Sequence, residues 1–154
     1  MIRKAEKRDI PSIMELLRQV NLIHHNGRPD LFQAQTKYGP EQLEALFQEE
    51  TMPVFVWTDE ADRPCGYCFC QLHSNKDDRM LTDIRTLYID DLCVDETKRG
   101  MHIGSELLDY VKAFAKSQGC YNVTLNVWAL NEKAYRFYKK AGMQIQKYGM
   151  ETIL

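Results

Sequence analysis

The residues best suited to chemistry gather where a strand pattern passes into a helix pattern. Val94 closes a run of β-favouring residues, and apolar residues recur at helical spacing from Ile103 to Phe114. The turn that joins them is Arg99-Gly100-Met101-His102-Ile103-Gly104. Backbone N–H groups at a helix start lack internal partners, the helix dipole is positive there, and glycines let a ligand approach closely. This spacing predicts a phosphate-binding turn, although similar turns also occur as simple connections.

A second set of polar residues falls on one face of a helix predicted from Asn131 to Gly142. Residues three and four apart share a helix face, which aligns the Asn131 amide with the Tyr138 hydroxyl. Asn131 is also suited to cap the helix, and aromatic residues on helices usually pack in a core. Those structural roles explain each residue singly but not their joint spacing behind an Arg-Gly turn, so we favour a functional role.

The rest of the sequence predicts the elements that position these residues. Strand patterns cover residues 2–5, 54–58, 66–73, 84–94, 121–128 and 143–154, and helix patterns cover 10–20, 40–47, 103–118 and 131–142. Asp9 is the expected N-cap of the first helix, and residues 21–38 are expected to form a long loop. The order β-α-α-β-β-β-α-β-α-β predicts an antiparallel meander followed by a parallel crossover. We expect one α+β domain over residues 1–154, a mixed sheet covered by helices.

Composition excludes several function classes. The chain has 20 Lys and Arg against 22 Asp and Glu, a formal charge of −2, which gives no general attraction to nucleic acid or membrane. The start of the chain lacks a signal-peptide pattern and no apolar run could span a bilayer, so we expect a cytoplasmic protein. Five cysteines, an odd number, indicate thiols rather than a disulfide framework. Cys65-x-x-Cys68 could suggest zinc or redox chemistry, but it falls on a strand and no second ligand pair follows.

Together the two motifs resemble the GNAT superfamily of acetyl-CoA-dependent N-acetyltransferases, and the element order agrees over nearly the whole chain. The turn at 99–104 is similar to the pyrophosphate signature of that family, except that His102 stands where the first signature glycine is usual. The second motif matches the family pattern at Asn131, Ala134, Phe137, Tyr138, Gly142 and Met143. The resemblance implies a GNAT fold with acetyl-CoA as co-substrate and no metal. It implies cofactor contacts at Leu92, Cys93, Val94, Arg99, Gly100, Met101, His102, Ile103, Gly104, Asn131 and Tyr138.

The chemistry that the resemblance implies has three parts. An acceptor ammonium has a pKa of about 10.4 and must lose a proton, and we assign that base to Asp90. Strand alternation places Asp90 on the face of Leu92 and Val94, opposite Asp91. A backbone N–H on the 92–94 segment would stabilise the oxyanion, and Tyr138, with Tyr135 as fallback, would return a proton to the CoA thiolate. Direct attack on the thioester needs no covalent enzyme intermediate.

The acceptor site is the least determined part of the prediction. By analogy with the family it is lined by the 21–38 segment, where His24, His25, Arg28 and Asp30 are the candidates, although His24 and His25 also fit a plain exposed loop. A small-molecule amine is preferred over a protein amine. A homodimer formed through an edge strand is plausible. The alternative from another class is a catalytically silent CoA-binding or regulatory module on the same scaffold.

Overall fold

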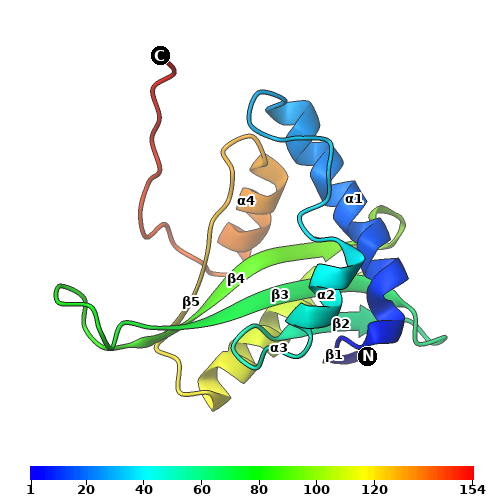
Figure 1. Cartoon of the computed structure of the whole chain (residues 1–154), viewed down its shortest axis with the longest axis horizontal. Helices are drawn as coiled ribbons and strands as arrows, with labels where there is room; N and C mark the ends of the chain where they lie inside the picture. The colour runs from blue at the N-terminus through cyan, green and yellow to red at the C-terminus, as the bar shows by residue number, and fades with distance from the viewer.

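A five-stranded mixed sheet runs through the middle of the molecule, and the computed structural model describes all residues from 1 to 154 (Figure 1). The first four strands pair antiparallel in sequence order, and the fifth pairs parallel with the fourth. The predicted meander and parallel crossover are therefore confirmed, as is the α+β class. The strands are β1 (Ile2–Lys4), β2 (Val54–Thr58), β3 (Pro64–Ser74), β4 (Arg85–Val94) and β5 (Asn122–Leu125).

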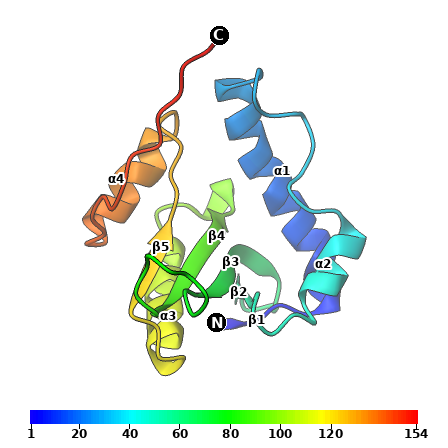
Figure 2. The same cartoon turned by 60° about the vertical axis from the view of Figure 1, so that its left-hand side comes forward.

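Helices cover both faces of this sheet. They are α1 (Ile10–Gly27), α2 (Pro40–Leu46), α3 (Ile103–Ser117) and α4 (Glu132–Lys140), with short 3-10 turns at Lys7–Asp9 and Glu96–Lys98. Figure 2 shows α1 and α2 on one side of the strands, α3 on the other, and α4 beyond β5. None of the helices combines the length and the apolar character needed to cross a membrane.

Two apolar clusters hold the layers together, one on each face of the sheet. Alternation along β3 explains them, because Tyr67 and Phe69 pack against α1 while Cys68 and Cys70 pack against α3. On the α3 side, Leu107 is fully buried. A truncation there, Leu107→Ala, would cost about 2–5 kcal/mol of stability, so this packing fixes the position of α3.

The first helix is longer than its apolar pattern predicts. Helix α1 continues to Gly27, although Leu22 and Ile23 are 55% and 40% exposed. Its last turn is held by tertiary contacts with Phe32, since the His24 ring stacks on Phe32 and His25 Nδ1 lies 2.7 Å from Phe32 O. Asp9 is not its side-chain N-cap. The Asp9 carboxylate instead accepts the Glu6 N–H at 2.8 Å and pairs with Arg3 at 2.7 Å.

The predicted last strand, residues 143–154, is wrong. This segment, which we call the tail, is extended but unpaired, and residues 144–154 form no backbone–backbone hydrogen bond. A strand needs a neighbouring edge, and the tail instead runs beside α4 away from the sheet (Figures 1 and 2). Strand β5 is also shorter than predicted, because β4 stops pairing with it after Ile89.

Candidate active site

A bulge in β4 sets the direction of the two acids. The β3–β4 pairing skips one residue at Asp90, so Asp90 and Asp91 both turn toward the α1 side of the sheet. Tyr38 Oη donates to Asp90 Oδ2 at 2.8 Å, and Tyr67 Oη donates to Asp91 Oδ2 at 2.8 Å. Both tyrosines pack in the α1-side cluster. The prediction that the acids lie on opposite faces is therefore wrong, because strand alternation fails across a bulge.

Past the bulge, β4 has a free side. Its parallel pairing with β5 covers only Thr86 to Ile89, so residues 90–94 have no strand beside them where β5 would continue. Leu92 and Val94 contribute their side chains to the α3-side cluster. Strands β4 and β5 therefore separate after Ile89, which leaves an edge of backbone at residues 90–94 that can meet an extended ligand.

The turn between β4 and α3 offers a row of free backbone donors. No acceptor receives the N–H groups of residues 100–105, and the first backbone bond of the helix runs from Glu106 N to His102 O at 3.0 Å. Gly100 has a φ of 86°, and His102 has a φ of 61° and a ψ of 9°. His102 therefore keeps the left-handed backbone that glycine adopts freely, at a conformational cost. Its ring is exposed, so it does not fill the turn.

Gly104 is the point where the turn, β4 and α4 meet. A methyl group placed on Gly104 would lie 3.3 Å from Phe137 Cζ and 3.6 Å from Val94 Cγ2. Phe137 and Tyr138 pack against the same cluster as Leu92 and Val94. The two sequence motifs are thus brought into contact, and a side chain at residue 104 would push them apart.

Helix α4 presents Tyr138 toward the end of β4. Its hydroxyl forms no hydrogen bond, and burial raises the pKa of this phenol above its ordinary value, with the nearby Cys68, Asp91 and Cys93 adding to the effect. The phenol therefore stays protonated at neutral pH. Asn131 does cap α4, since its side-chain oxygen accepts the Ala134 N–H at 3.2 Å. The helix-capping role considered for Asn131 is therefore confirmed, and its side-chain N–H₂ group remains free to bind a ligand.

The surroundings of Asp90 were not predicted from sequence. Lys37 Nζ lies 2.8 Å from Asp90 Oδ1, and the Asp90 side chain is 11% exposed. Lys37 and Tyr38 lie 52 and more residues before Asp90, so no local spacing connects them. Together they fix the orientation of the Asp90 carboxylate on the α1 side of the sheet.

Asp91 and Cys93 lie deeper on the same side. Burial raises the pKa of the Asp91 carboxyl, and the Tyr67 hydrogen bond offsets part of that effect. Burial also raises the pKa of Cys93 to about 12, and its Sγ lies 3.7 Å from Leu16 O. The Cys93 thiol faces α1, away from Gly104, so only its backbone is available to a ligand at the free side of β4.

Three aromatic rings mark the side where the acceptor was predicted. His24 stacks on Phe32 with ring centroids 4.9 Å apart, and Phe32 meets Trp128 edge-on at 5.0 Å. Burial, and to a smaller extent Lys37, lowers the pKa of His24, which is therefore neutral at pH 7. His24 and His25 lie in the last turn of α1 rather than in a loop. Sequence reasoning missed Phe32, because no periodic pattern surrounds it.

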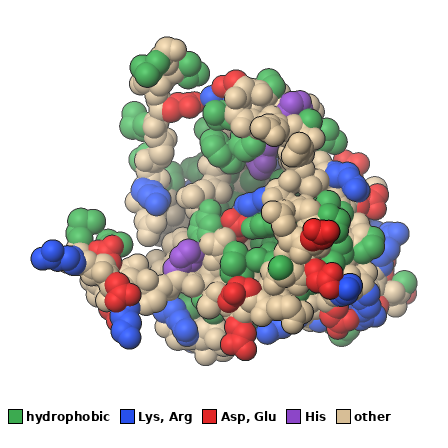
Figure 3. Space-filling view, viewed as in Figure 1, with side chains coloured by type: hydrophobic (Ala, Val, Ile, Leu, Met, Phe, Trp, Pro, Cys, Tyr) green, Lys and Arg blue, Asp and Glu red, His purple; other side chains and the backbone are tan.

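The other predicted acceptor residues are engaged with one another or with backbone. His25 Nδ1 lies 2.7 Å from Phe32 O. Arg28 pairs with Asp30 at 2.8 Å and with Glu151 of the tail at 2.6 Å. In the space-filling view the tail stands off the body and meets it again near the end of α1, and acidic and basic side chains are mixed over this face (Figure 3). Arg28 and Asp30 thus lie at the rim, farther out than His24.

The Cys65-x-x-Cys68 pair does not form a ligand set. All five cysteines are free, and Cys65, Cys68 and Cys70 pack in the same α3-side cluster. Cys68 Sγ lies 3.7 Å from Cys70 Sγ, and Cys65 Sγ lies 3.5 Å from Arg63 O. These thiols act as small core residues.

The sequence model of the Acetyltransferase (GNAT) family matches residues 14–143, which include both motifs, most of α1 and every later element. The chain belongs to this family. A mutant protein from Bacillus halodurans solved by X-ray crystallography is 33% identical, with a TM-score of 0.95 over 100% of this chain and 99% of that one.

Two curated relatives are named as N-acetyltransferases. The thialysine N-epsilon-acetyltransferase of Bos taurus is 28% identical over 94% of this chain and 84% of its own length. An uncharacterized N-acetyltransferase of Methanocaldococcus jannaschii is 26% identical over 93% of this chain, which spans 60% of the length of that relative.

Proposed function

We propose that this GNAT protein transfers an acetyl group from acetyl-CoA to a primary amine of a small molecule, by direct attack in a ternary complex. The observation that carries the proposal is the meeting at Gly104 of three features: the unpaired N–H groups of residues 100–105, the free side of β4 at residues 90–94, and the Tyr138 face of α4.

The cofactor would lie along these three features. The N–H groups of the turn, with the positive end of the α3 dipole and the Arg99 side chain, suit the pyrophosphate. The free edge of β4 from Leu92 to Val94 suits the amide-rich pantetheine arm, whose donors and acceptors would pair with that backbone. A backbone N–H there would also stabilise the oxyanion. The Asn131 amide would complete the contact from α4.

The reacting groups would come from opposite sides of β4. Asp90, oriented by Lys37 and Tyr38, would take the proton from the acceptor ammonium, and the neutral amine would attack the thioester carbonyl. The C–S bond then breaks, the nitrogen of the new amide loses its extra proton to solvent, and Tyr138 would protonate the departing thiolate, because its hydroxyl is protonated at neutral pH and has no other partner. The phenolate would regain its proton from solvent. No covalent bond to the enzyme is needed.

The acceptor would lie against His24, Phe32 and Trp128, with Lys37 and Asp90 at the inner end. A surface of this kind, with aromatic rings and a carboxylate at its inner end, suits a small amine better than a protein surface. The bovine relative named for thialysine supports an amine of amino-acid size. Acetyl-CoA as donor is consistent with a cytoplasmic location.

A panel of amines tests the proposal. We expect free thiol to be released from acetyl-CoA with at least one amine from a set that contains thialysine, lysine, polyamines, amino sugars, aminoglycosides and a lysine peptide. Release with the peptide alone would overturn the small-molecule assignment. Binding of acetyl-CoA without release for any amine would favour the catalytically silent module instead.

The Tyr138 assignment has its own test. Tyr138→Phe should lower kcat by about 10²-fold or more, the usual contribution of a positioned general acid, while the Kd for acetyl-CoA changes by less than about threefold. Tyr135→Phe tests the fallback acid. Because Tyr135 is 40% exposed on the same helix, we expect this variant to keep its kcat. Equal loss in both variants, or normal turnover for Tyr138→Phe, would remove the role from Tyr138.

A further inference from the structure

A lysine amine of the chain itself lies against the proposed base. Lys37 belongs to the loop between α1 and α2, and its Nζ lies 2.8 Å from Asp90 Oδ1 and donates to the backbone oxygen of Asp90 at 3.2 Å. The free side of β4 begins at residue 90. The Lys37 ammonium is therefore within reach of the carboxylate that would take a proton from an acceptor, at the start of the edge where the cofactor would lie.

The loop around Lys37 is fixed by contacts on both sides of this residue. Tyr38 stacks on Phe69 of the α1-side cluster with ring centroids 5.3 Å apart, and its hydroxyl donates to the other carboxylate oxygen of Asp90. Thr36 Oγ1 donates to Tyr38 O at 2.9 Å. These contacts hold the Lys37 backbone beside Asp90. The Lys37 side chain is 44% exposed, so its amine stays open to a co-substrate that binds along the strand.

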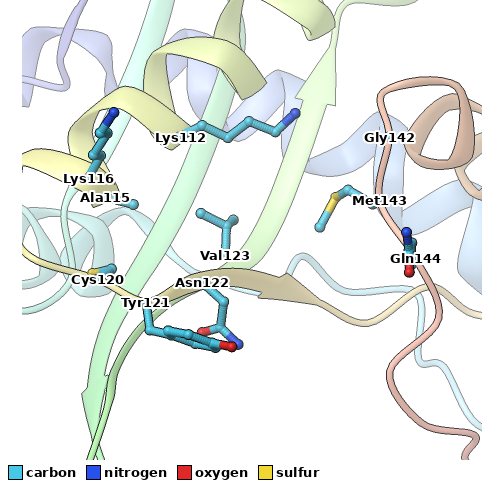
Figure 4. Close-up of a pocket in the computed structure, with 10 residues that line it drawn as sticks. All are labelled: Lys112, Ala115, Lys116, Cys120, Tyr121, Asn122, Val123, Gly142, Met143 and Gln144. Carbon is cyan, nitrogen blue, oxygen red and sulfur yellow. The ribbon is translucent and has the colours of Figure 1, made fainter.

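The other lysines lack this combination of a sheltered carboxylate and the edge of β4. Lys7 pairs with Glu44 at 2.6 Å, but the Glu44 side chain is 50% exposed, whereas that of Asp90 is 11% exposed. Lys116 borders a groove of about 430 Å³ beside β5, and none of the candidate active-site residues lines that groove (Figure 4). The Lys116 ammonium has no ion-pair partner, so it is a suitable reference for an ordinary surface lysine.

We propose that Lys37 is a self-acetylation site: when no acceptor is bound, its Nζ takes the acetyl group of acetyl-CoA bound to the same chain. This inference rests on the proposed function, because it uses the same donor, base and acid. The Lys37 ammonium gives one proton to Asp90, and the neutral amine attacks the thioester carbonyl carbon. The N–C bond forms and the C–S bond breaks, the nitrogen loses a second proton to solvent, and Tyr138 protonates the CoA thiolate. Asp90 then releases its proton to solvent, and the Tyr138 phenolate regains one.

Acetylation would change the acceptor side of β4. An acetylated lysine is neutral, so the ion pair between Lys37 and Asp90 would be lost. Asp90 would keep the hydrogen bond from Tyr38 on one oxygen, while its other oxygen would lose the contact that orients it. The modified chain would therefore bind an amine acceptor more weakly. Acetyl-CoA in excess over acceptor would in this way lower the activity of the site.

Mass spectrometry of the full-length protein incubated with acetyl-CoA alone tests the inference. We expect one acetyl group per chain, mapped to Lys37 in the digested protein, at a rate about 100-fold or more above that of Lys116, which is the contribution of a positioned base. The rate constant should not depend on protein concentration, since the amine and the bound donor belong to one chain. Lys37→Arg should abolish this product, and the control Lys116→Arg should leave it unchanged.

Asp90→Asn separates catalysed acetylation from the uncatalysed reaction of an exposed lysine with acetyl-CoA. This variant frees the Lys37 amine from its ion pair but removes the base, so acetylation of Lys37 should fall about 100-fold, to the rate of Lys116. Unchanged or faster acetylation would overturn the inference, as would a rate constant that rises with protein concentration.

The amine panel, run on the same preparation, separates this inference from the proposed function. A chain that acetylates an amine of the panel but leaves Lys37 unmodified in acetyl-CoA alone would overturn the self-acetylation and leave the proposed function standing. A chain that releases no thiol with any amine and leaves Lys37 unmodified would overturn both.

Discussion

The two sides of β4 differ in how far apart in the sequence their residues lie. On the α3 side, the free strand edge, the turn and the Tyr138 face all come from residues 90–138, and Gly104 lets them touch. On the α1 side, Asp90 is held by Lys37 and Tyr38, and an aromatic cluster joins His24 to Trp128. A site built from neighbouring motifs can be found by spacing, whereas a site built from distant segments cannot. The following variants test whether the two sides also work independently.

The largest effect is expected at Gly104, where the α3 side is most tightly packed. Gly104→Val would place side-chain atoms against Phe137 and Val94, which are already 3.3 Å and 3.6 Å from a Cβ at that position. Overpacking of this kind should lower the free energy of unfolding by about 1–3 kcal/mol and weaken acetyl-CoA binding at least tenfold, since α4 is displaced. Chemical denaturation and calorimetric titration measure the two quantities.

Gly149→Val is the matched control for that variant, because nothing lies within 4 Å of a Cβ at Gly149. It should change neither quantity. Normal acetyl-CoA binding in Gly104→Val would mean that contact between the two motifs is not what forms the cofactor site.

A smaller effect, confined to the other side, is expected from Lys37→Met. The Asp90 carboxylate, which is 11% exposed in the wild type, would lose its ion pair, so its orientation toward the acceptor would loosen. We expect the KM of the amine to rise about tenfold while the Kd of acetyl-CoA stays constant. The control is Lys7→Met, whose ion pair with Glu44 is highly exposed. Loss of acetyl-CoA affinity in Lys37→Met would show that the two sides of β4 are coupled.

The sequence predicted the α3 side well for physical reasons that are local. Helical spacing within residues 131–142 and a strand-turn-helix at 89–104 depend on neighbours three to four residues apart, so both were confirmed. The bulge at Asp90 was not predictable, since nothing in the residue types shows where a ladder skips a position. The strand predicted for the tail was wrong for a related reason. Its residue types favour a strand, but a strand forms only where it can pair with the edge of a sheet.

The pH dependence of stability can distinguish the two neighbouring acids. Burial raises the pKa of Asp91 above its ordinary 3.8. Protonated Asp91 therefore contributes its full share to the free energy of unfolding below about pH 3.8. That contribution is lost as the pH rises through the raised pKa of the folded state. The asparagine of Asp91→Asn cannot ionise, so this variant does not lose stability as the pH rises. Its side-chain oxygen can still accept the hydrogen bond from Tyr67. Its free energy of unfolding relative to wild type should therefore increase between pH 4 and pH 8, as measured by urea denaturation.

Asp90→Asn is the control for that measurement, because it breaks the ion pair with Lys37 and should lower the free energy of unfolding at pH 7. Parallel profiles for the two variants would contradict the different roles that the bulge gives to these residues.

The smallest expected effect concerns His102, the residue that departs from the family signature. Its left-handed backbone costs a non-glycine residue about 1–2 kcal/mol, while glycine would give back about 0.5–1 kcal/mol through the entropy of the unfolded chain. His102→Gly should therefore raise the free energy of unfolding by a few tenths to about 1 kcal/mol. The exposed ring has no hydrogen bond to lose, so acetyl-CoA binding should stay the same or improve slightly.

Gly100→Ala provides the opposite case. Residue 100 has a φ of 86° with open space around it, so an alanine there would be strained without a clash and should lower the free energy of unfolding. If His102→Gly instead weakens acetyl-CoA binding, the His102 ring is a cofactor ligand and the turn of this chain binds phosphate with a side chain as well as with backbone.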